Sequence, residues 1–486
     1  MKYMHLSIKE LHQLLVEHKV TPLELTKEAI ELAKNNDDNA FEYILEKEAL
    51  EFASTLVDVE EDNLFWGIPY VCKDNFSTKD IPTTGSSDIL KDYVPIFDSE
   101  VVRRLKEKKA ILIGKTTLDE LAMGGSGTTG HLGISYNPWD NTHTRHVGGS
   151  SCGSAIAASA GIVPFAIGSD TGDSVRKPAC YAGLVGFKPT WGRISRWGLF
   201  PFATSLDHVA YFTRSVEDSA LLLNLLAGRD EKDSTSSLVP VSEYTSLLNK
   251  GIKGKKIAVI KEIADTLVDP TLKEEFEKTI NVFKELGATV EVVSMSRNLL
   301  LALYPTYMII SCAEATSNNA NLDGIKFGLR EAGNSYQEIM TNTRSKGFSE
   351  LIRRRFIIGS YSLLKENQDE LFLRAQKARR LIVDAVNDIL KDYDAIYTPA
   401  ATSTAPKFND TSLDRNSDQY LIGENHMGLA NFAGLPSITL PICIKEGLPF
   451  GANLTSKAFD EVNLFQIASA LEAKTSLKGI VAKEDK

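Results

Sequence analysis

Two serine-containing turns lie close together within the stretch His146–Ala179. Ser150 follows a pair of glycines in the first turn, and Ser174 follows Gly172 and Asp173 in the second. Glycines beside a serine favour tight turns in which backbone N–H groups converge on a developing negative charge. A serine becomes a strong nucleophile when a nearby base removes its proton. The stretch is therefore a candidate for nucleophilic catalysis by serine.

The residues between these turns are small or apolar. Ala155–Ala160 predicts a helix packed so closely that only small side chains fit. Val163–Ile167 predicts a short buried strand that delivers Ser169–Ser174 to one edge of a sheet. This order of elements would bring the two serines together from opposite ends of one unit.

A candidate base lies upstream in the segment Gly67–Phe76. Lys73 follows the apolar run Ile68–Cys72, and Trp66–Cys72 predicts a strand that ends at this lysine. A buried ammonium is costly to keep charged, so we expect a lowered pKa that frees Lys73 to act as a base. Taken alone, Lys73 would be a surface or salt-bridged lysine, and each serine a turn residue. The joint pattern favours a Ser–Lys arrangement.

Together these motifs resemble the amidase signature family: GGSS before a small-residue helix, then GSDTG-x-S-x-R-x-PA, with an upstream KDN lysine. The resemblance extends over nearly the whole chain. Gly114–Gly127, Gly186–Asp207 and Phe212–Gly228 are most similar to one branch, the A subunits of aspartyl/glutamyl-tRNA amidotransferases. That branch supplies the glutaminase of the tRNA-dependent route to Gln-tRNA.

The resemblance implies a Ser-Ser-Lys triad. Lys73 would be the base, Ser150 the bridging serine after a cis peptide bond, and Ser174 the nucleophile that attacks the glutamine side-chain amide. Ammonia would leave, and water would release glutamate from the acyl-enzyme. The implied oxyanion hole consists of consecutive backbone N–H groups, those of Thr171, Gly172, Asp173 and Ser174.

The resemblance also implies a glutamine-binding set. Arg355 suits a substrate carboxylate because its planar fork binds such groups in bidentate fashion, although Arg353–Arg355 alone would be interpreted as a solvated face. The glycine loop Gly124–Gly130 lacks the spacing of a Walker or dinucleotide motif and is implied to form a wall of the site. The full implied set is Tyr307, Arg355, Glu424, Gly124, Gly125 and Ser126.

Several residues depart from the usual family pattern. Asp173 and Cys152 replace glycines, Lys177 replaces a glutamine, and Glu424 replaces an aspartate. Aspartate tolerates unusual backbone angles, but its charge about 4 Å from the oxyanion would oppose it by about 4 kcal/mol at an effective dielectric constant near 20. We therefore expect weak glutamine turnover or a different preferred amide.

The alternating elements are compatible with an α/β fold, and the resemblance implies an α/β/α sandwich with a large mixed central sheet covered by helices. A single amidase domain over residues 1–486 is expected, with a helical arm at about 1–60, a signature core at about 61–228 and a second α/β portion at about 255–480. Ile257–Val293 predicts a βαβ layer over the main sheet.

Other elements follow from capping residues and apolar runs. The expected helices begin after Ser7, Thr21 and Ser215 and cover Tyr43–Ala53, Thr117–Met123, Leu272–Leu286, Leu300–Asn318, Gln337–Glu366, Lys365–Leu390 and Asp460–Glu472. The expected strands include Ala110–Ile113, Ala395–Thr398 and Ile438–Ile444.

Composition limits the partners of the chain. With 43% hydrophobic and 24% charged residues and a net charge of -10, the chain is a poor generic nucleic-acid binder. The resemblance implies amidotransferase subunits B and C as partners, with most of the tRNA contact, ATP and Mg²⁺ at a partner and no cofactor in this chain. The 8 histidines and 5 cysteines show no metal-ligand spacing. The opening residues are no signal peptide and no apolar run predicts a membrane span, so a cytoplasmic location is expected.

Alternative functions remain open at this point. Gly149–Gly153 also fits the G-x-S-x-G nucleophile elbow of α/β-hydrolases, with Ser151 as nucleophile, but only His208 and His426 follow as candidate bases. A stand-alone amidase of the same family would hydrolyse amides without partners. A relative that has become a non-catalytic scaffold is favoured by Asp173 and Cys152 and opposed by the retained triad.

Overall fold

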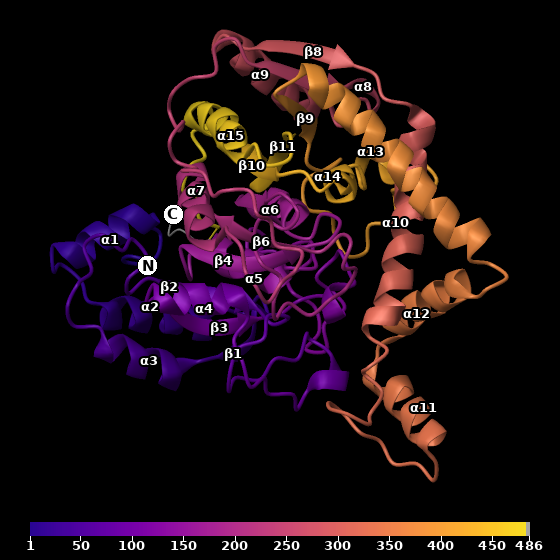
Figure 1. The fold of residues 1–486 in the computed structure, drawn as a ribbon. Helices are drawn as coiled ribbons and strands as arrows, with labels where there is room; N and C mark the ends of the chain where they lie inside the picture. Colours follow the sequence, from indigo (N-terminus) through magenta and orange to yellow (C-terminus); the bar gives the residue numbers. More distant parts are fainter. Residues whose placement is uncertain (483–486) are drawn as a thin grey trace.

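One mixed sheet of 11 strands runs through the computed structural model, which describes residues 1–482 (Figure 1). The strand order is β1-β3-β2-β4-β6-β5-β10-β11-β9-β7-β8. β2 lies parallel between β3 and β4, and β7 lies parallel between β8 and β9, whereas the other neighbours are antiparallel. The strands are β1 Phe41–Ile44, β2 Pro69–Lys73, β3 Ile111–Thr116, β4 Phe165–Asp170, β5 Val185–Lys188, β6 His208–Thr213, β7 Lys256–Ile260, β8 Thr289–Val293, β9 Ala395–Pro399, β10 Ser437–Lys445 and β11 Leu448–Thr455.

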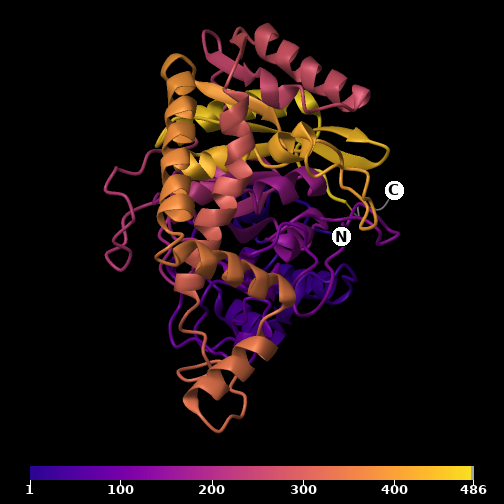
Figure 2. The same cartoon turned by 90° about the vertical axis from the view of Figure 1, so that its right-hand side faces the viewer.

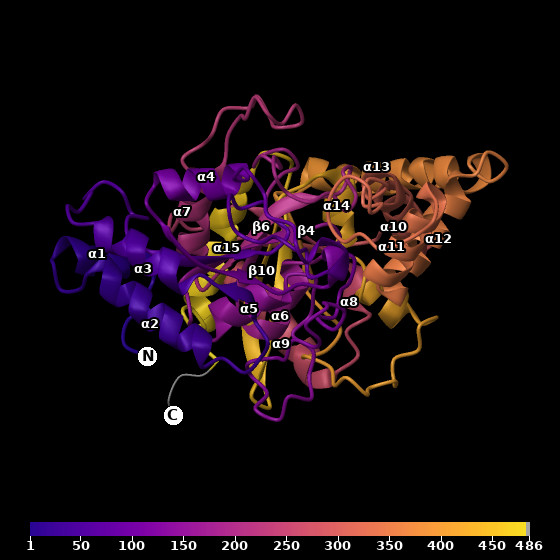
Figure 3. The same cartoon turned by 90° about the horizontal axis from the view of Figure 1, so that it is seen from below.

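Helices cover both faces of this sheet, which confirms the predicted α/β/α sandwich. Seen from below, α4 and α7 lie on one side of the central strands and α5 and α6 on the other (Figure 3). The α-helices are α1 Ile8–Val16, α2 Pro22–Lys34, α3 Glu46–Thr55, α4 Glu100–Glu107, α5 Cys152–Ser159, α6 Arg176–Ala182, α7 Val216–Leu226, α8 Lys261–Ala264, α9 Pro270–Glu285, α10 Arg297–Asn318, α11 Tyr336–Gly347, α12 Glu350–Leu363, α13 Arg374–Asp392, α14 Gly428–Ala433 and α15 Glu461–Thr475.

The size of the side chains on the central strands determines how closely each layer of helices packs against the sheet. On one face the Tyr211 hydroxyl donates to a carbonyl of α7, and Phe187 packs 4.7 Å from the ring of Phe465 in α15. On the opposite face, a Cβ on Gly186 would lie 2.5 Å from the Ala179 side chain in α6. A Cβ on Gly168 would lie 2.9 Å from the first serine turn. Glycines therefore let α5 and α6 lie directly against the strands that carry the candidate site.

The predicted helix starts of the N-terminal arm are confirmed. Ser7 and Thr21 each form a reciprocal capping box with the glutamate three residues later. Ser215 likewise accepts a hydrogen bond from the Asp218 N–H at the start of α7. These local signals are reliable because each cap satisfies backbone N–H groups that have no partner inside the helix.

Several predicted elements were wrong in extent or type. The helix predicted for Tyr43–Ala53 is divided between β1 and α3, because Phe41–Ile44 pairs with β3 at the sheet edge. The helix predicted for Thr117–Met123 is only a short 3₁₀ turn, Glu120–Ala122. The helix predicted from Lys365 begins as an α-helix at Arg374, after a π-helical turn.

The predicted position of the βαβ unit, as a layer over the main sheet, is also wrong. β7 and β8 are parallel neighbours, and β7 pairs with β9, so the unit extends the edge of the same sheet. β1, β5, β6 and β11 were not predicted as strands. β5, β6 and most of β11 are buried, so they lack the alternating exposure that makes a strand visible in a sequence.

A long apolar helix, α10, lies beside α12 and α13 on one side of the molecule (Figure 2). By length and mean hydropathy of 1.3 it could cross a membrane, contrary to the expectation that the chain has no such run. However, 44% of its most apolar stretch of 18 residues is buried in the fold. Its residues Leu303, Tyr307 and Met308 also line a cavity. We therefore interpret α10 as a packed helix of the domain.

Candidate active site

Lys73 lies at the end of β2 and is fully buried, as is Ser150. The Lys73 ammonium donates to Ser150 Oγ at 2.8 Å. Burial in a site of low polarity lowers the pKa of Lys73 to about 7, even though Cys152, Asp119 and other nearby acidic groups act in the opposite direction. A substantial neutral fraction near neutral pH makes this amine a chemically competent base.

Two further side chains surround the lysine and were missed in the sequence. Lys73 Nζ donates to Ser169 Oγ at 2.9 Å, and Asn75 Nδ2 donates to the same oxygen at 3.1 Å. Ser169 lies on β4, next to β2 in the sheet. The KDN motif contains Asn75, but only the pairing of these strands reveals that both residues orient the lysine.

The two serine turns are joined directly. The Ser151 N–H donates to the Ser174 carbonyl oxygen at 3.2 Å, and Ser151 Oγ donates to the Ser169 carbonyl oxygen at 3.0 Å. The peptide bond between Gly149 and Ser150 is cis, as the resemblance implied. Ser151 is thus engaged with the backbone beneath the turn, whereas Ser174 lines the cavity.

An ion pair fixes the second turn. Arg176 binds Asp170 through two nitrogens, at 3.1 and 3.0 Å, and also donates to the Gly172 carbonyl oxygen at 2.8 Å. Burial opposes ionisation of Asp170, but the Arg176 guanidinium outweighs it and holds the pKa of that carboxyl well below its usual range.

The backbone of this turn carries four consecutive N–H groups, and its residues Gly172, Asp173 and Ser174 line the cavity. Within residues 1–482 we find no internal acceptor for the N–H groups of Thr171, Gly172, Asp173 and Ser174. The Thr171 hydroxyl is held by Asp207 at 2.7 Å. Neither Gly172 nor Asp173 has a positive φ, so aspartate at this position requires no unusual backbone angle.

A cavity of about 370 Å³ opens in front of Ser174. It brings together every residue of the implied glutamine-binding set, from four separate segments of the chain. Lys73 and Ser150 are buried and are not among the residues that line it. The lining includes Gly124, Gly125, Ser126, Tyr307, Arg355 and Glu424, together with Asp173 and Lys177.

Asp119 supports the glycine loop and was not singled out in the sequence. Its carboxylate accepts hydrogen bonds from the consecutive backbone N–H groups of residues 126–129, at 3.0–3.1 Å. Its own N–H donates to the Ser150 carbonyl oxygen at 3.1 Å. The N–H groups of residues 126–129 in the glycine loop are therefore paired with a carboxylate of the chain itself.

Three of the departures from the family pattern meet in one network. Lys177 Nζ lies 2.8 Å from Glu424 Oε2 and 3.4 Å from Asp173 Oδ2. Burial disfavours all three charges, but the two carboxylates outweigh it for the lysine and raise the pKa of Lys177 above its usual range. Burial raises the pKa of Asp173, which has the longer contact. Lys177 thus offsets part of the charge of Asp173 in the second turn while it also pairs with Glu424.

The fourth departure, Cys152, is a packing residue. It begins α5, and its thiol lies near Ser135 Oγ and the Thr117 carbonyl oxygen. Burial raises the pKa of Cys152 to about 12, so the thiolate needed for nucleophilic attack is not formed near neutral pH.

These features match a known family. The model of the amidase family matches residues 24–465. The chain belongs to the amidase family. This match covers the lysine strand, both serine turns and the elements that carry the cavity, so the family relationship extends over the whole catalytic fold.

Amidase relatives with a specific name match along almost their full length. The chain is 40% identical over 480 residues to the A subunit of the glutamyl-tRNA(Gln) amidotransferase of Streptococcus pneumoniae (strain Hungary19A-6), covering 98% of this chain and 97% of the relative. The corresponding protein of Streptococcus thermophilus (strain CNRZ 1066) matches equally. The crystal structure of the A subunit from Thermotoga maritima superposes with a TM-score of 0.81 and 36% identity, covering 99% of this chain and 98% of that one.

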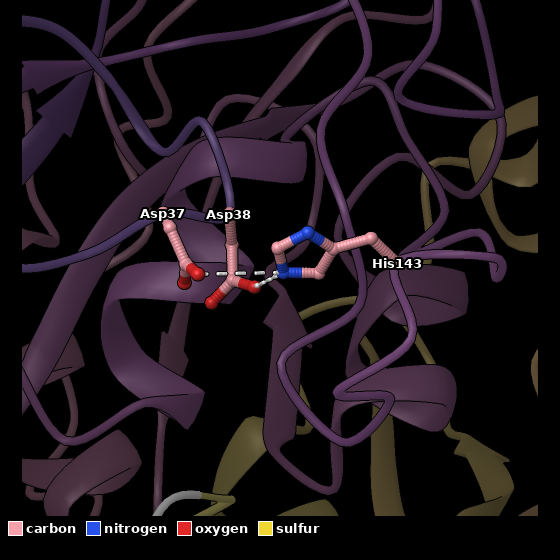
Figure 4. Close-up of side chains that lie close together, drawn as sticks. All are labelled: Asp37, Asp38 and His143. Atoms are coloured by element: carbon pink, nitrogen blue, oxygen red, sulfur yellow. Dashed lines mark ion pairs between the residues drawn. The ribbon is translucent and has the colours of Figure 1, made fainter.

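A separate cluster of an exposed, a buried and a half-buried side chain joins two segments far apart in the sequence (Figure 4). His143 Nε2 lies 3.3 Å from Asp38 Oδ1 and 3.8 Å from Asp37 Oδ2. Residue spacing did not predict this group, because its members are brought together only by the fold. Histidine and carboxylates are ligand types for metals, but the ion pairs between them also account for the arrangement.

Proposed function

We propose that this chain is the glutaminase subunit of a tRNA-dependent amidotransferase, with Ser174 as the nucleophile. The observations that support this most directly are the buried hydrogen bond between Lys73 and Ser150 and the place of Ser174 in the lining of the cavity. The near full-length similarity to the A subunits of glutamyl-tRNA(Gln) amidotransferases supports the choice of reaction.

In the proposed reaction, protons move from Ser174 to Ser150 and from Ser150 to the neutral amine of Lys73. Ser174 Oγ attacks the amide carbon of glutamine and forms a tetrahedral oxyanion. The C–N bond then breaks, and the nitrogen leaves as ammonia after taking up a proton through the same serine–lysine path. Water next attacks the acyl-enzyme ester, releases glutamate and restores the Ser174 hydroxyl.

The backbone N–H groups of Thr171, Gly172, Asp173 and Ser174 are proposed to bind the oxyanion. They have no internal acceptor in the described part of the chain, and the Asp170–Arg176 pair fixes the turn that carries them. Donors that are already oriented stabilise developing charge without reorganising in the reaction.

Arg355 is proposed to bind the substrate carboxylate, with Tyr307 against the second turn and the loop of Gly124, Gly125 and Ser126 as the opposite wall. A Cβ on Gly172 would lie 3.2 Å from the Tyr307 ring, so this glycine allows the ring to approach the oxyanion turn. Glu424 lines the same cavity and provides a carboxylate on the substrate side.

The relatives are named as one subunit of an amidotransferase, which indicates a complex of several chains. We propose that subunits B and C are the partners and that a partner binds ATP, Mg²⁺ and most of the tRNA. The net charge of -10 fits a limited contact of this chain with nucleic acid. We also propose a cytoplasmic location, on the ground of the similarity to the A subunits of amidotransferases.

The test compares ammonia release from glutamine by the wild type, Ser174→Ala, Ser150→Ala and Ser151→Ala, with and without candidate B and C subunits. We expect Ser174→Ala to lower kcat by on the order of 10³-fold or more. Full activity in Ser174→Ala together with loss in Ser151→Ala would favour the nucleophile elbow instead. Activity that no partner changes would favour a stand-alone amidase.

A further inference from the structure

Two consecutive acidic residues after β3, Asp119 and Glu120, bind two different segments that carry lining residues of the catalytic cavity. Both side chains are buried. They lie at the start of a short 3₁₀ turn in which Leu121 and Ala122 have left-handed φ angles of 50° and 62°. Such angles cost non-glycine residues about 1–3 kcal/mol each and persist where the surrounding structure enforces them. The turn therefore holds both carboxylates in defined positions.

Asp119 contacts both the glycine loop and the first serine turn. Its carboxylate accepts from the Thr129 hydroxyl at 2.8 Å, in addition to the N–H groups of residues 126–129. A Cβ on Gly149, in the first serine turn, would lie 2.0 Å from Asp119 Oδ2. A Cβ on Gly124, which lines the cavity, would lie 2.4 Å from Asp119 Cγ. The carboxylate thus packs against the cavity wall and against the turn that carries the bridging serine.

The charge of Asp119 also acts on the candidate base. Burial lowers the pKa of Lys73 to about 7. The titratable groups that act in the opposite direction are Cys152, Asp119, Asp170 and Asp207. A nearby negative charge favours the ammonium form, which is the form that Lys73 takes once it has accepted a proton.

Glu120 binds the start of α12, the helix that carries Arg355. Its carboxylate accepts from the Ser349 N–H at 3.2 Å and from the Ser87 hydroxyl at 2.5 Å. Ser349 is the N-cap residue of α12, and its own side chain makes no capping hydrogen bond. Glu120 thus takes the part that a glutamate of the helix itself plays in a capping box, and its negative charge suits a helix N-terminus.

We propose that Asp119 and Glu120 are positioning residues for amide hydrolysis. Asp119 holds the glycine-loop wall against the turn of the bridging serine and keeps a negative charge near Lys73. Glu120 holds α12 so that Arg355 meets the substrate carboxylate. The proposal deepens the function proposed above and rests on it for the roles of Lys73 and Arg355. Neither acid is among the residues that line the cavity, so the covalent steps are unchanged.

The test of Asp119 is the rate and pH profile of glutamine hydrolysis. Asp119→Asn should lower kcat by on the order of 10²-fold, because the wall and the serine turn lose their common acceptor. The midpoint of its kcat/KM profile should lie at lower pH than in the wild type, because a charge that favours the ammonium form of Lys73 is gone. Thr129→Val is the milder variant, since it removes one hydrogen bond and keeps the charge. It should lower kcat/KM by about threefold and leave the midpoint unchanged.

The test of Glu120 is a split between KM and kcat. Glu120→Ala should raise KM for glutamine by about tenfold, with kcat within about twofold of the wild type and the midpoint unchanged. Glu120→Gln should restore most of the wild-type KM, because its amide oxygen can still accept from the Ser349 N–H. Glu472→Ala is the matched control, since Glu472 is also buried and accepts from the Val216 N–H at the start of α7 at 2.8 Å. It should lower the melting temperature without raising KM.

Amide hydrogen exchange gives a readout that does not depend on turnover. Asp119→Asn should speed exchange at residues 126–129 and Glu120→Ala at Ser349, whereas Glu472→Ala should change neither. Unchanged exchange in the loop, or a wild-type kcat with an unshifted midpoint in Asp119→Asn, would overturn the role of Asp119. If that variant does not fold, a wild-type kcat/KM in Thr129→Val would overturn it instead.

The outcomes separate the two proposals. An unchanged KM in Glu120→Ala would overturn the role of Glu120 and leave the glutaminase proposal standing. Absence of amide hydrolysis by the wild type under every condition would overturn the proposed function, while the exchange measurements would still decide whether the two acids hold their segments.

Discussion

The pH dependence of amide hydrolysis should report the buried lysine. Burial lowers the pKa of Lys73 from 10.5 to about 7. If the neutral amine is the base, kcat/KM is proportional to the neutral fraction, which is about 0.1 at pH 6, about 0.5 at pH 7 and about 0.9 at pH 8. We therefore expect a rise of about tenfold between about pH 6 and pH 8, followed by a plateau.

The assay is ammonia release at low substrate concentration, so that kcat/KM reports the free enzyme. Burial lowers the pKa of His146, which lines the cavity, and raises that of Asp207 to about 6. His146→Gln and Asp207→Asn are therefore the controls, and both should keep the midpoint near pH 7 even if the rate falls. A lysine with its ordinary pKa would instead give a tenfold rise per pH unit to beyond about pH 9, and that profile would refute the reasoning.

Two stability predictions follow from buried contacts. Arg176→Met leaves the buried Asp170 carboxylate without its guanidinium and should lower the free energy of unfolding by about 3–5 kcal/mol, measured by urea denaturation; a loss below about 1 kcal/mol would contradict the ion-pair argument. Gly153→Ala places a Cβ 2.3 Å from the Ala40 carbonyl oxygen and 2.5 Å from Thr117 Oγ1, and we expect a loss of about 1–3 kcal/mol with a lower melting temperature. An unchanged melting temperature would show that α5 can shift freely.

Local sequence signals predicted the elements that depend on local chemistry. The capping boxes at Ser7 and Thr21 satisfy N–H groups within a single helical turn, so their residues are adjacent in sequence. The helix α5 could also be predicted, because close packing excludes large side chains and leaves a run of small residues in the sequence. The edge position of β7 and β8 was not visible, since it depends on pairing with β9, more than a hundred residues further along the chain.

The sequence by itself determined the chemical types at the site: a lysine after a buried strand, serines in glycine-flanked turns, and an arginine suited to a carboxylate. Only the tertiary structure decided what surrounds them. The pairing of β2 with β4 brings Ser169 Oγ within hydrogen-bonding distance of Lys73 Nζ. The fold also brings Asp173, Lys177 and Glu424 together into one network of ion pairs. The reason is physical: charges interact through space, so whether Asp173 opposes an oxyanion or is partly offset by Lys177 depends on distances that residue spacing does not contain.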